Sequence, residues 1–311
     1  MALDLRPLDF GDKIGATFKV YQSNFTILIT IVAIVVIPLQ ILAALVGWLF
    51  ANDLPIDPDT GLIDAEAIEA SMIVGFLGTA ILLAIITAIG TLLATAGVMK
   101  AIADHALGAA PDWQDSLRFA WSKIGPLVVG SIFYGLGLAG VMVAAVIALI
   151  VLVAMLDAFG AFVGVIVLIG AVVFVVVLAV SWSVWVPAVL LENKSGAKAL
   201  GRSNDLTKGR RWPTLGFLVV IYIIVGLINA SVGGMLSRLF SDPLAQTVIN
   251  IALTVFTTPI AAAAIVVLYF DHRVRSEPFD IEHLANELGG DPGRDFGQFG
   301  TLPPDEPPPP Q

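Results

Sequence analysis

The chain has 311 residues, of which 58% are hydrophobic and 13% charged, and its formal net charge is −9. A soluble domain carries about 25% charged residues, so this chain has too few charges to cover a globule in water. It contains no cysteine, which excludes disulfides, thiolate metal sites and cysteine nucleophiles.

Six apolar runs are long enough to cross a bilayer as helices, because a hydrocarbon core about 30 Å thick takes roughly 20 apolar residues. The runs are continuous, whereas a transmembrane barrel needs alternating residues. Between Pro126 and Glu192 the only charged residue is Asp157, so the sequence "LDAFGA" there predicts a tight turn between two spans. We therefore expect an all-α integral membrane protein with spans at 26–50, 72–99, 127–156, 161–191, 215–232 and 248–270.

Basic residues near the span ends predict the orientation, because Lys and Arg accumulate on the cytoplasmic side. With six spans, fifteen Lys and Arg fall on one side and only Arg238 on the other. We therefore expect both termini in the cytoplasm of a multi-pass cell-membrane protein. The first span follows 25 residues that include Asp4, Asp9 and Asp12, and it is longer than the apolar region of a signal peptide, so we expect it to be retained.

A similar short segment precedes each pair of spans, near positions 13, 115 and 197. Each combines bases with apolar residues at helical spacing, which is typical of a helix lying in the membrane interface. The sequence thus predicts three hairpins, each preceded by a cytoplasmic interfacial helix. The expected division is an N-terminal arm at 1–25, a six-span domain at 26–270, a cytoplasmic C-terminal helix at 271–288 and an acidic, Pro-rich disordered tail at 289–311.

Uncharged polar residues within the second, fifth and sixth spans suggest a weakly polar cleft. The candidates are Asn229, Asn250, Thr254 and Thr258. Such residues also help helices to approach and to hydrogen-bond to each other, and packing of this kind is the alternative interpretation. The prolines at 38, 187 and 259 predict kinks in the first, fourth and sixth spans.

The segment 190–217 holds six of the sixteen Lys and Arg residues, and bases near a membrane surface attract anionic headgroups. We expect a cytoplasmic rim that contacts anionic lipids, and Glu192 is placed to pair with a neighbouring base or, alternatively, to serve as a substrate or proton site. The rim candidates are Glu192, Lys194, Lys198, Arg202, Lys208, Arg210, Arg211, Arg273 and Arg275.

No catalytic, metal or cofactor motif is present. The three histidines, His105, His272 and His283, are far apart, and no zinc-protease, P-loop or nucleophile-elbow pattern occurs. We expect no cofactor, no enzymatic activity and no binding to nucleic acid.

Three segments resemble prokaryotic membrane proteins grouped as the glycerophosphoryl diester phosphodiesterase membrane domain. They are the opening "RPLDFGDKIGATFKVYQSNF", the segment "PAVLLENKSGAKALGRSNDLTKGRRWPTLG" and the closing "LYFDHRVRSEPFDIEHLA", where Pro278 replaces the usual Gly. In the middle segment the matching positions are Pro187, Glu192, Ala199, Ser203, Leu206, Gly209 and Trp212. The resemblance implies a multi-span membrane domain and no particular activity.

Three functions are compatible with these features. A non-catalytic scaffold or accessory factor, with self-association as one form of this role, agrees best with the absence of catalytic motifs. A permease or lipid-handling transporter would need Asn229, Asn250 and Thr258 in one polar cavity at mid-depth. A membrane-embedded lipid enzyme would need Glu192, Asp271 and His272 within hydrogen-bond reach of one another.

Overall fold

The computed structural model describes residues 7–52 and 70–276, which contain helices and no strand, so the predicted all-helical class is confirmed. Five helical segments are long and apolar enough to cross a membrane: Phe25–Leu49, Val74–Ala106, Ile124–Glu192, Arg211–Leu239 and Pro243–Ser276. The C-terminal helix and tail predicted beyond residue 276 lie outside the described residues, as does most of the acidic loop after the first span.

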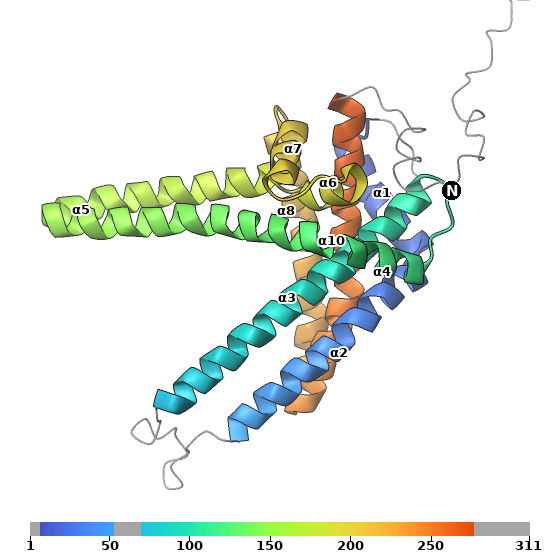
Figure 1. Ribbon diagram of the computed structural model, residues 1–311, viewed down its shortest axis with the longest axis horizontal. Coiled ribbons are helices and arrows are strands. Elements are labelled where there is room, and N and C mark those ends of the chain that lie inside the picture. Colours follow the sequence, from blue (N-terminus) through green and yellow to red (C-terminus); the bar gives the residue numbers. More distant parts are fainter. Residues whose placement is uncertain (1–6, 53–69, 277–311) are drawn as a thin grey trace, which may run out of the picture.

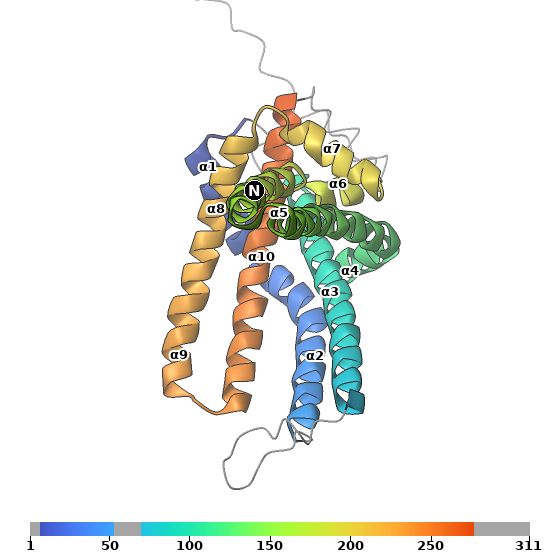
Figure 2. The same cartoon turned by 90° about the vertical axis from the view of Figure 1, so that its left-hand side faces the viewer.

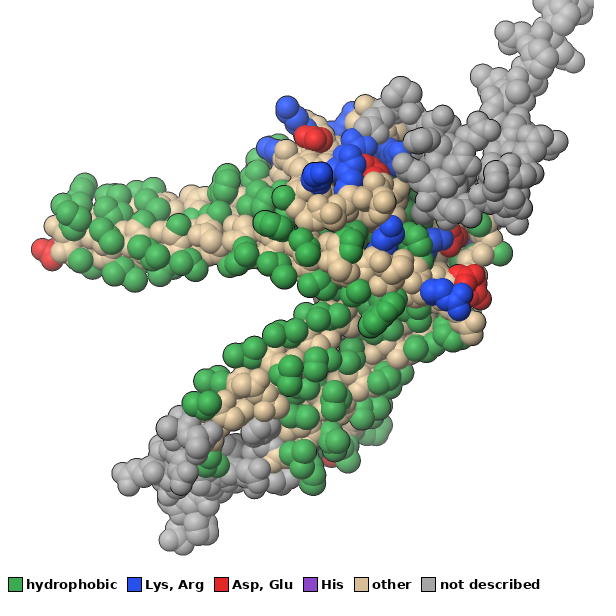
Figure 3. All heavy atoms as spheres, viewed as in Figure 1, with side chains coloured by type: hydrophobic (Ala, Val, Ile, Leu, Met, Phe, Trp, Pro, Cys, Tyr) green, Lys and Arg blue, Asp and Glu red, His purple; other side chains and the backbone are tan. Residues whose placement is uncertain are grey.

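Short helices and long helices separate in space (Figure 1). The short helices α1 (Phe10–Ser23), α4 (Trp113–Ser122), α6 (Trp185–Glu192) and α7 (Ala197–Thr207) gather at one end of the molecule, around the C-terminal end of α10 (Pro243–Ser276). We call this part the charged layer, because Lys, Arg, Asp and Glu side chains gather there in the view of Figure 3. The core also lies close to it, with Phe217, Tyr269 and Phe270 almost fully buried.

Three groups of long helices diverge from the charged layer (Figures 1 and 2). One is the pair α2 (Phe25–Asn52) and α3 (Ala70–Ala106), and another is α5 (Ile124–Ser181), which folds back on itself. The last consists of α8 (Arg211–Ile228), the π-helix η1 (Asn229–Gly233) and α9 (Gly234–Leu239) beside α10. Hydrophobic side chains cover α5 and the pair α2 and α3 on the face that Figure 3 shows, as expected where lipid is the solvent.

The third and fourth predicted spans lie within one long apolar segment, Ile124–Glu192, so such segments number five and not six among the described residues. The chain nevertheless reverses at Asp157, whose φ of 48° and ψ of −127° are not helical. The two limbs of α5 lie against each other, since a side chain at Gly164 would collide with Leu149. Six separate crossings of a bilayer remain a prediction.

The predicted fourth span, 161–191, is interrupted, because α5 ends at Ser181 and α6 begins at Trp185. Pro187 explains the position of the break: it lacks an N–H, and in a continuous helix its ring would clash with the carbonyl of Ser183. Ser203 of α7 joins the two ends. Its hydroxyl donates to the Ser181 carbonyl at 2.9 Å and accepts from the Val184 N–H at 3.1 Å.

The last two spans differ from their predicted bounds. Helix begins at Arg211 instead of residue 215 and continues through η1 and α9 to Leu239, past the expected end at 232. The sixth helix starts at Pro243 and ends at Ser276, beyond the expected 248–270. The expected domain boundary between residues 270 and 271 therefore falls inside α10, and the residues after it belong to the charged layer.

Candidate functional site

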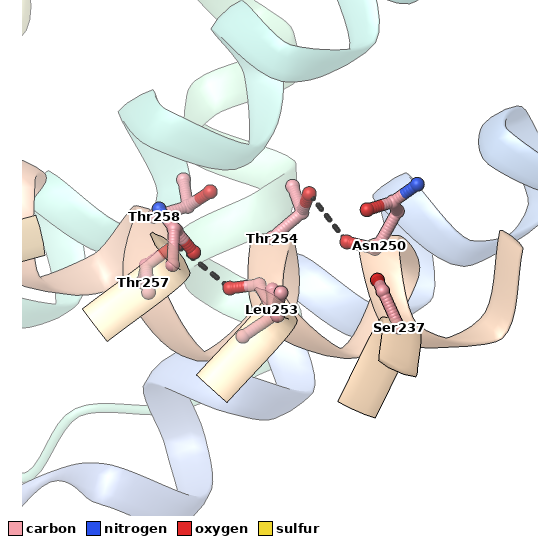
Figure 4. Close-up of a pocket in the computed structure, with 8 residues that line it drawn as sticks. Ser237, Asn250, Leu253, Thr254, Thr257 and Thr258 are labelled. Carbon is pink, nitrogen blue, oxygen red and sulfur yellow. Dashed lines mark hydrogen bonds between the residues drawn. The ribbon is translucent and has the colours of Figure 1, made fainter. Parts of the chain in front are cut away.

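A pocket of about 440 Å³ lies between α10 and the segment formed by η1 and α9. Figure 4 shows the side chains of Asn250, Thr254 and Thr258 on one side of α10, spaced four residues apart as one helical face requires. The lining consists of Asn229, Gly233, Ser237, Asn250, Leu253, Thr254, Thr257 and Thr258.

The π-helix shapes one wall of the pocket. A π-helical turn contains an additional residue, and such turns occur frequently at functional sites. Gly233, the last residue of η1, lies against α10, because a Cβ there would stand 2.9 Å from the Leu253 side chain. A larger residue at 233 would therefore push Leu253 and alter the cavity.

Some polar side chains of the lining form hydrogen bonds within the chain, and others do not. Thr254 donates to the Asn250 carbonyl at 2.8 Å, and Thr257 donates to the Leu253 carbonyl at 2.7 Å. Within residues 7–52 and 70–276, no hydrogen bond engages the side chains of Asn229, Asn250 or Thr258. Two carboxamides and one hydroxyl are thus available to a ligand or to water.

Both ends of the pocket are fastened by side chains. At the end remote from the charged layer, Ser237 donates to the Gln246 carboxamide oxygen at 2.7 Å, which ties α9 to α10. At the other end lies Pro259, and Tyr21 of α1 donates to the Phe256 carbonyl at 3.1 Å, one turn before this proline. Burial raises the pKa of the Tyr21 phenol, which keeps it a proton donor.

The structure places all four predicted cleft residues, Asn229, Asn250, Thr254 and Thr258, in the lining of this one pocket. Their binding of any ligand remains a prediction. The second span was expected to take part, but no residue of α3 lines the pocket. The sequence interpretation also missed Ser237, because the fifth span was predicted to end at residue 232 and the helix in fact continues to 239.

Glu192 lies inside the charged layer, with 8% of its side chain exposed. It accepts from Arg202 Nε at 2.7 Å and from the Tyr269 hydroxyl at 3.0 Å, and Lys194 Nζ stands 3.7 Å away. Arg273 in turn donates to the Tyr269 hydroxyl at 3.0 Å. The carboxylate thus joins α6, α7 and α10. The predicted pairing with a neighbouring base is thus made by Arg202 and, at a longer distance, Lys194, whereas no ion pair is formed between Glu192 and Lys198.

Asp271 lies at the centre of a second network. Only 1% of its side chain is exposed. It pairs with Lys13 Nζ at 2.7 Å and with Arg275 Nε at 2.7 Å, and it accepts from the Leu8 N–H at 2.9 Å. Arg275 also donates to the Leu8 carbonyl at 2.6 Å. This carboxylate fastens the N-terminal segment and α1 to the end of α10.

The three residues required for an embedded enzyme each have a different set of partners. His272 is buried, and its Nε2 lies 3.0 Å from the Thr214 hydroxyl. Glu192 and Asp271 are occupied by the two networks described above, and no hydrogen bond links any two of the three residues. Among the described residues, no group of three or more His, Asp or Glu side chains could hold a metal ion.

The predicted rim residues fall into two sets. Glu192, Arg202, Arg273 and Arg275 form the internal networks, and Arg211 donates to Asn204 at 2.8 Å. Contact of the rim residues with lipid headgroups remains a prediction. The exposed bases are Lys194, Lys198, Lys208 and Arg210.

Comparison of the chain with protein-family models, with curated proteins and with solved structures finds no match. The resemblance noted in the sequence therefore remains a prediction.

Proposed function

We propose that this chain is a non-catalytic, multi-pass cell-membrane protein that binds a ligand in the pocket between η1–α9 and α10, in a permease or lipid-handling role. The single observation that supports this role is the pocket itself, where Asn229, Asn250 and Thr258 converge without partners from the described chain. Polar groups within hydrocarbon are costly unless they are satisfied, so an occupant would stabilise them.

The proposal includes a topology of six spans with both termini in the cytoplasm, so that the charged layer lies on the cytoplasmic side of the membrane. Its two buried carboxylates each join several helices, which is a structural use of charge. The exposed bases Lys194, Lys198, Lys208 and Arg210 would then face anionic headgroups of the inner leaflet, each contributing about 1 kcal/mol near the surface.

Co-purified molecules test the pocket directly. We would isolate the full-length protein in native lipid discs, extract the bound molecules and identify them by mass spectrometry. The wild type should retain a species that the double variant Asn229→Leu/Asn250→Leu loses, because leucine replaces each free carboxamide with an apolar group of the same branching. Thr87→Val is the control, since Thr87 lies on α3 and only donates to the carbonyl of Leu83. Identical profiles in all three proteins would contradict a binding role.

A scaffold or accessory role is the second candidate, and α5 favours it. This folded-back helix contacts other elements near its base, while many of its apolar side chains are exposed, among them Phe159, Phe162 and Ile166. In a bilayer such an apolar surface is covered either by lipid or by another membrane protein. The second case would be a scaffold or accessory role. Loss of a co-purifying protein upon polar substitution of Phe162 would support this role.

A further inference from the structure

The chemistry of the pocket restricts its ligand. The eight lining residues include two carboxamides and four hydroxyls but no acidic or basic side chain. A net charge moved into such a site would lose its hydration without gaining a counter-charge, which is strongly unfavourable. The lining therefore favours an uncharged ligand.

The lining also determines the hydrogen bonds that the ligand must make. Asn229 and Asn250 each present both a donor and an acceptor. The hydroxyls of Thr254, Thr257 and Ser237 already donate their protons to the chain, so toward a ligand they can only accept. A ligand that fits must donate repeatedly and accept at some positions, and an alcohol hydroxyl does both.

The volume of the pocket and its position along α10 agree with a small chemical group as the ligand and not with a long polymer. The volume of about 440 Å³ lies in the range of roughly 300 to 1,000 Å³ that is typical of small-molecule pockets. At 1.5 Å per helical residue, Asn250 lies about 10 Å and Thr258 about 22 Å from the start of α10 at Pro243. The pocket thus lies in the half of the helix remote from the charged layer.

We infer that the pocket binds an uncharged group with several hydroxyls, of the size of a single sugar. This inference rests on the proposed binding function and specifies its ligand. Two sources share this chemistry: the headgroup of a neutral sugar-bearing lipid, which would approach from the surrounding leaflet, and a free sugar from the aqueous side.

The test uses the full-length protein in phosphatidylcholine discs. Three samples receive a diacylglycerol carrying one neutral hexose, the anionic lipid phosphatidylglycerol or free glucose, and a fourth sample receives nothing. Native mass spectrometry measures the bound fraction. We expect the hexose lipid to bind, and Asn250→Leu to reduce its affinity at least tenfold. Gly233→Ala should also change binding, because its Cβ would stand 2.9 Å from Leu253 Cδ1 and this lining side chain would have to shift. Gly234→Ala is the matched control, since nothing lies within 4 Å of the added Cβ.

The outcomes separate the ligand class from the pocket's role. Asn250-dependent binding of the hexose lipid, or of free glucose in its place, supports the inference and identifies the source. Asn250-dependent binding of phosphatidylglycerol overturns the uncharged ligand but leaves the binding function standing. A dimer that dissociates in Asn250→Leu overturns the ligand in favour of a second copy of the chain. No dependence on Asn250 with any addition, together with unchanged co-purified molecules, overturns both proposals.

Discussion

Ser203 provides a sharp test of how the interrupted fourth span is held together. Its side chain is fully buried and makes two hydrogen bonds across the break, to the Ser181 carbonyl and from the Val184 N–H. In Ser203→Ala the carbonyl retains a partner, because Thr207 also donates to it at 3.1 Å. The Val184 N–H loses its partner, and an unsatisfied buried donor costs about 1–3 kcal/mol.

We therefore expect Ser203→Ala to lower the free energy of unfolding by about 2 kcal/mol, measured by detergent-induced unfolding in mixed micelles. Thr207→Val is the matched variant, and it should cost about 1 kcal/mol or less because Ser203 still serves the same carbonyl. Hydrogen exchange should become faster at the Val184 amide only in Ser203→Ala. Equal losses in the two variants, or unchanged exchange at Val184, would refute this account of the break.

Three further predictions concern the charged layer and the orientation. Asp271→Asn weakens two buried ion pairs, and removing one partner of a buried pair costs about 3–5 kcal/mol; limited proteolysis should release the N-terminal segment, whereas Asp205→Asn on an exposed site should leave it protected. Tyr21→Phe keeps the ring but removes the bond to the Phe256 carbonyl, so exchange near this turn of α10 should rise, and an unchanged pattern would contradict the link to α1. The chain has no cysteine, so Asp157→Cys should react with an impermeant reagent on intact cells and Asp205→Cys only after permeabilisation; the reverse pattern would invert the proposed orientation.

The helical class and the reversal of α5 could be predicted because both follow from local composition. Asp157, the only charged residue within 127–191, identified where the long apolar run turns, and the chain reverses at this residue. The polar residues of the sixth span were also predictable, since Asn250, Thr254 and Thr258 repeat every four residues and so share one helical face. That these residues share a pocket with Asn229 depends on how α10 packs against the segment formed by η1 and α9. The four-residue repeat does not determine this packing.

Contacts between distant residues account for what the sequence did not predict. Pro187 indicated a kink, but the separation of α5 from α6 is stabilised by Ser203, which lies 22 residues beyond Ser181. Of the two basic residues that pair with Asp271, Lys13 lies on α1, near the other end of the chain. Helix ends were also misplaced, because apolar composition identifies the lipid-facing part of a helix, whereas α10 continues into the charged layer as far as Ser276.

The distribution of polar groups explains why the pocket, and not the charged layer, is the place to look for a ligand. In the charged layer the two buried carboxylates are paired with bases of the same chain, as with Asp271 and Lys13 or Glu192 and Arg202. These bonds fix the helices to one another, and a ligand could bind there only by displacing them. The pocket contains Asn229 and Asn250, whose carboxamides make no bond within the described residues. A molecule entering the pocket would gain hydrogen bonds without breaking any made by these two side chains, and that asymmetry favours binding between η1–α9 and α10.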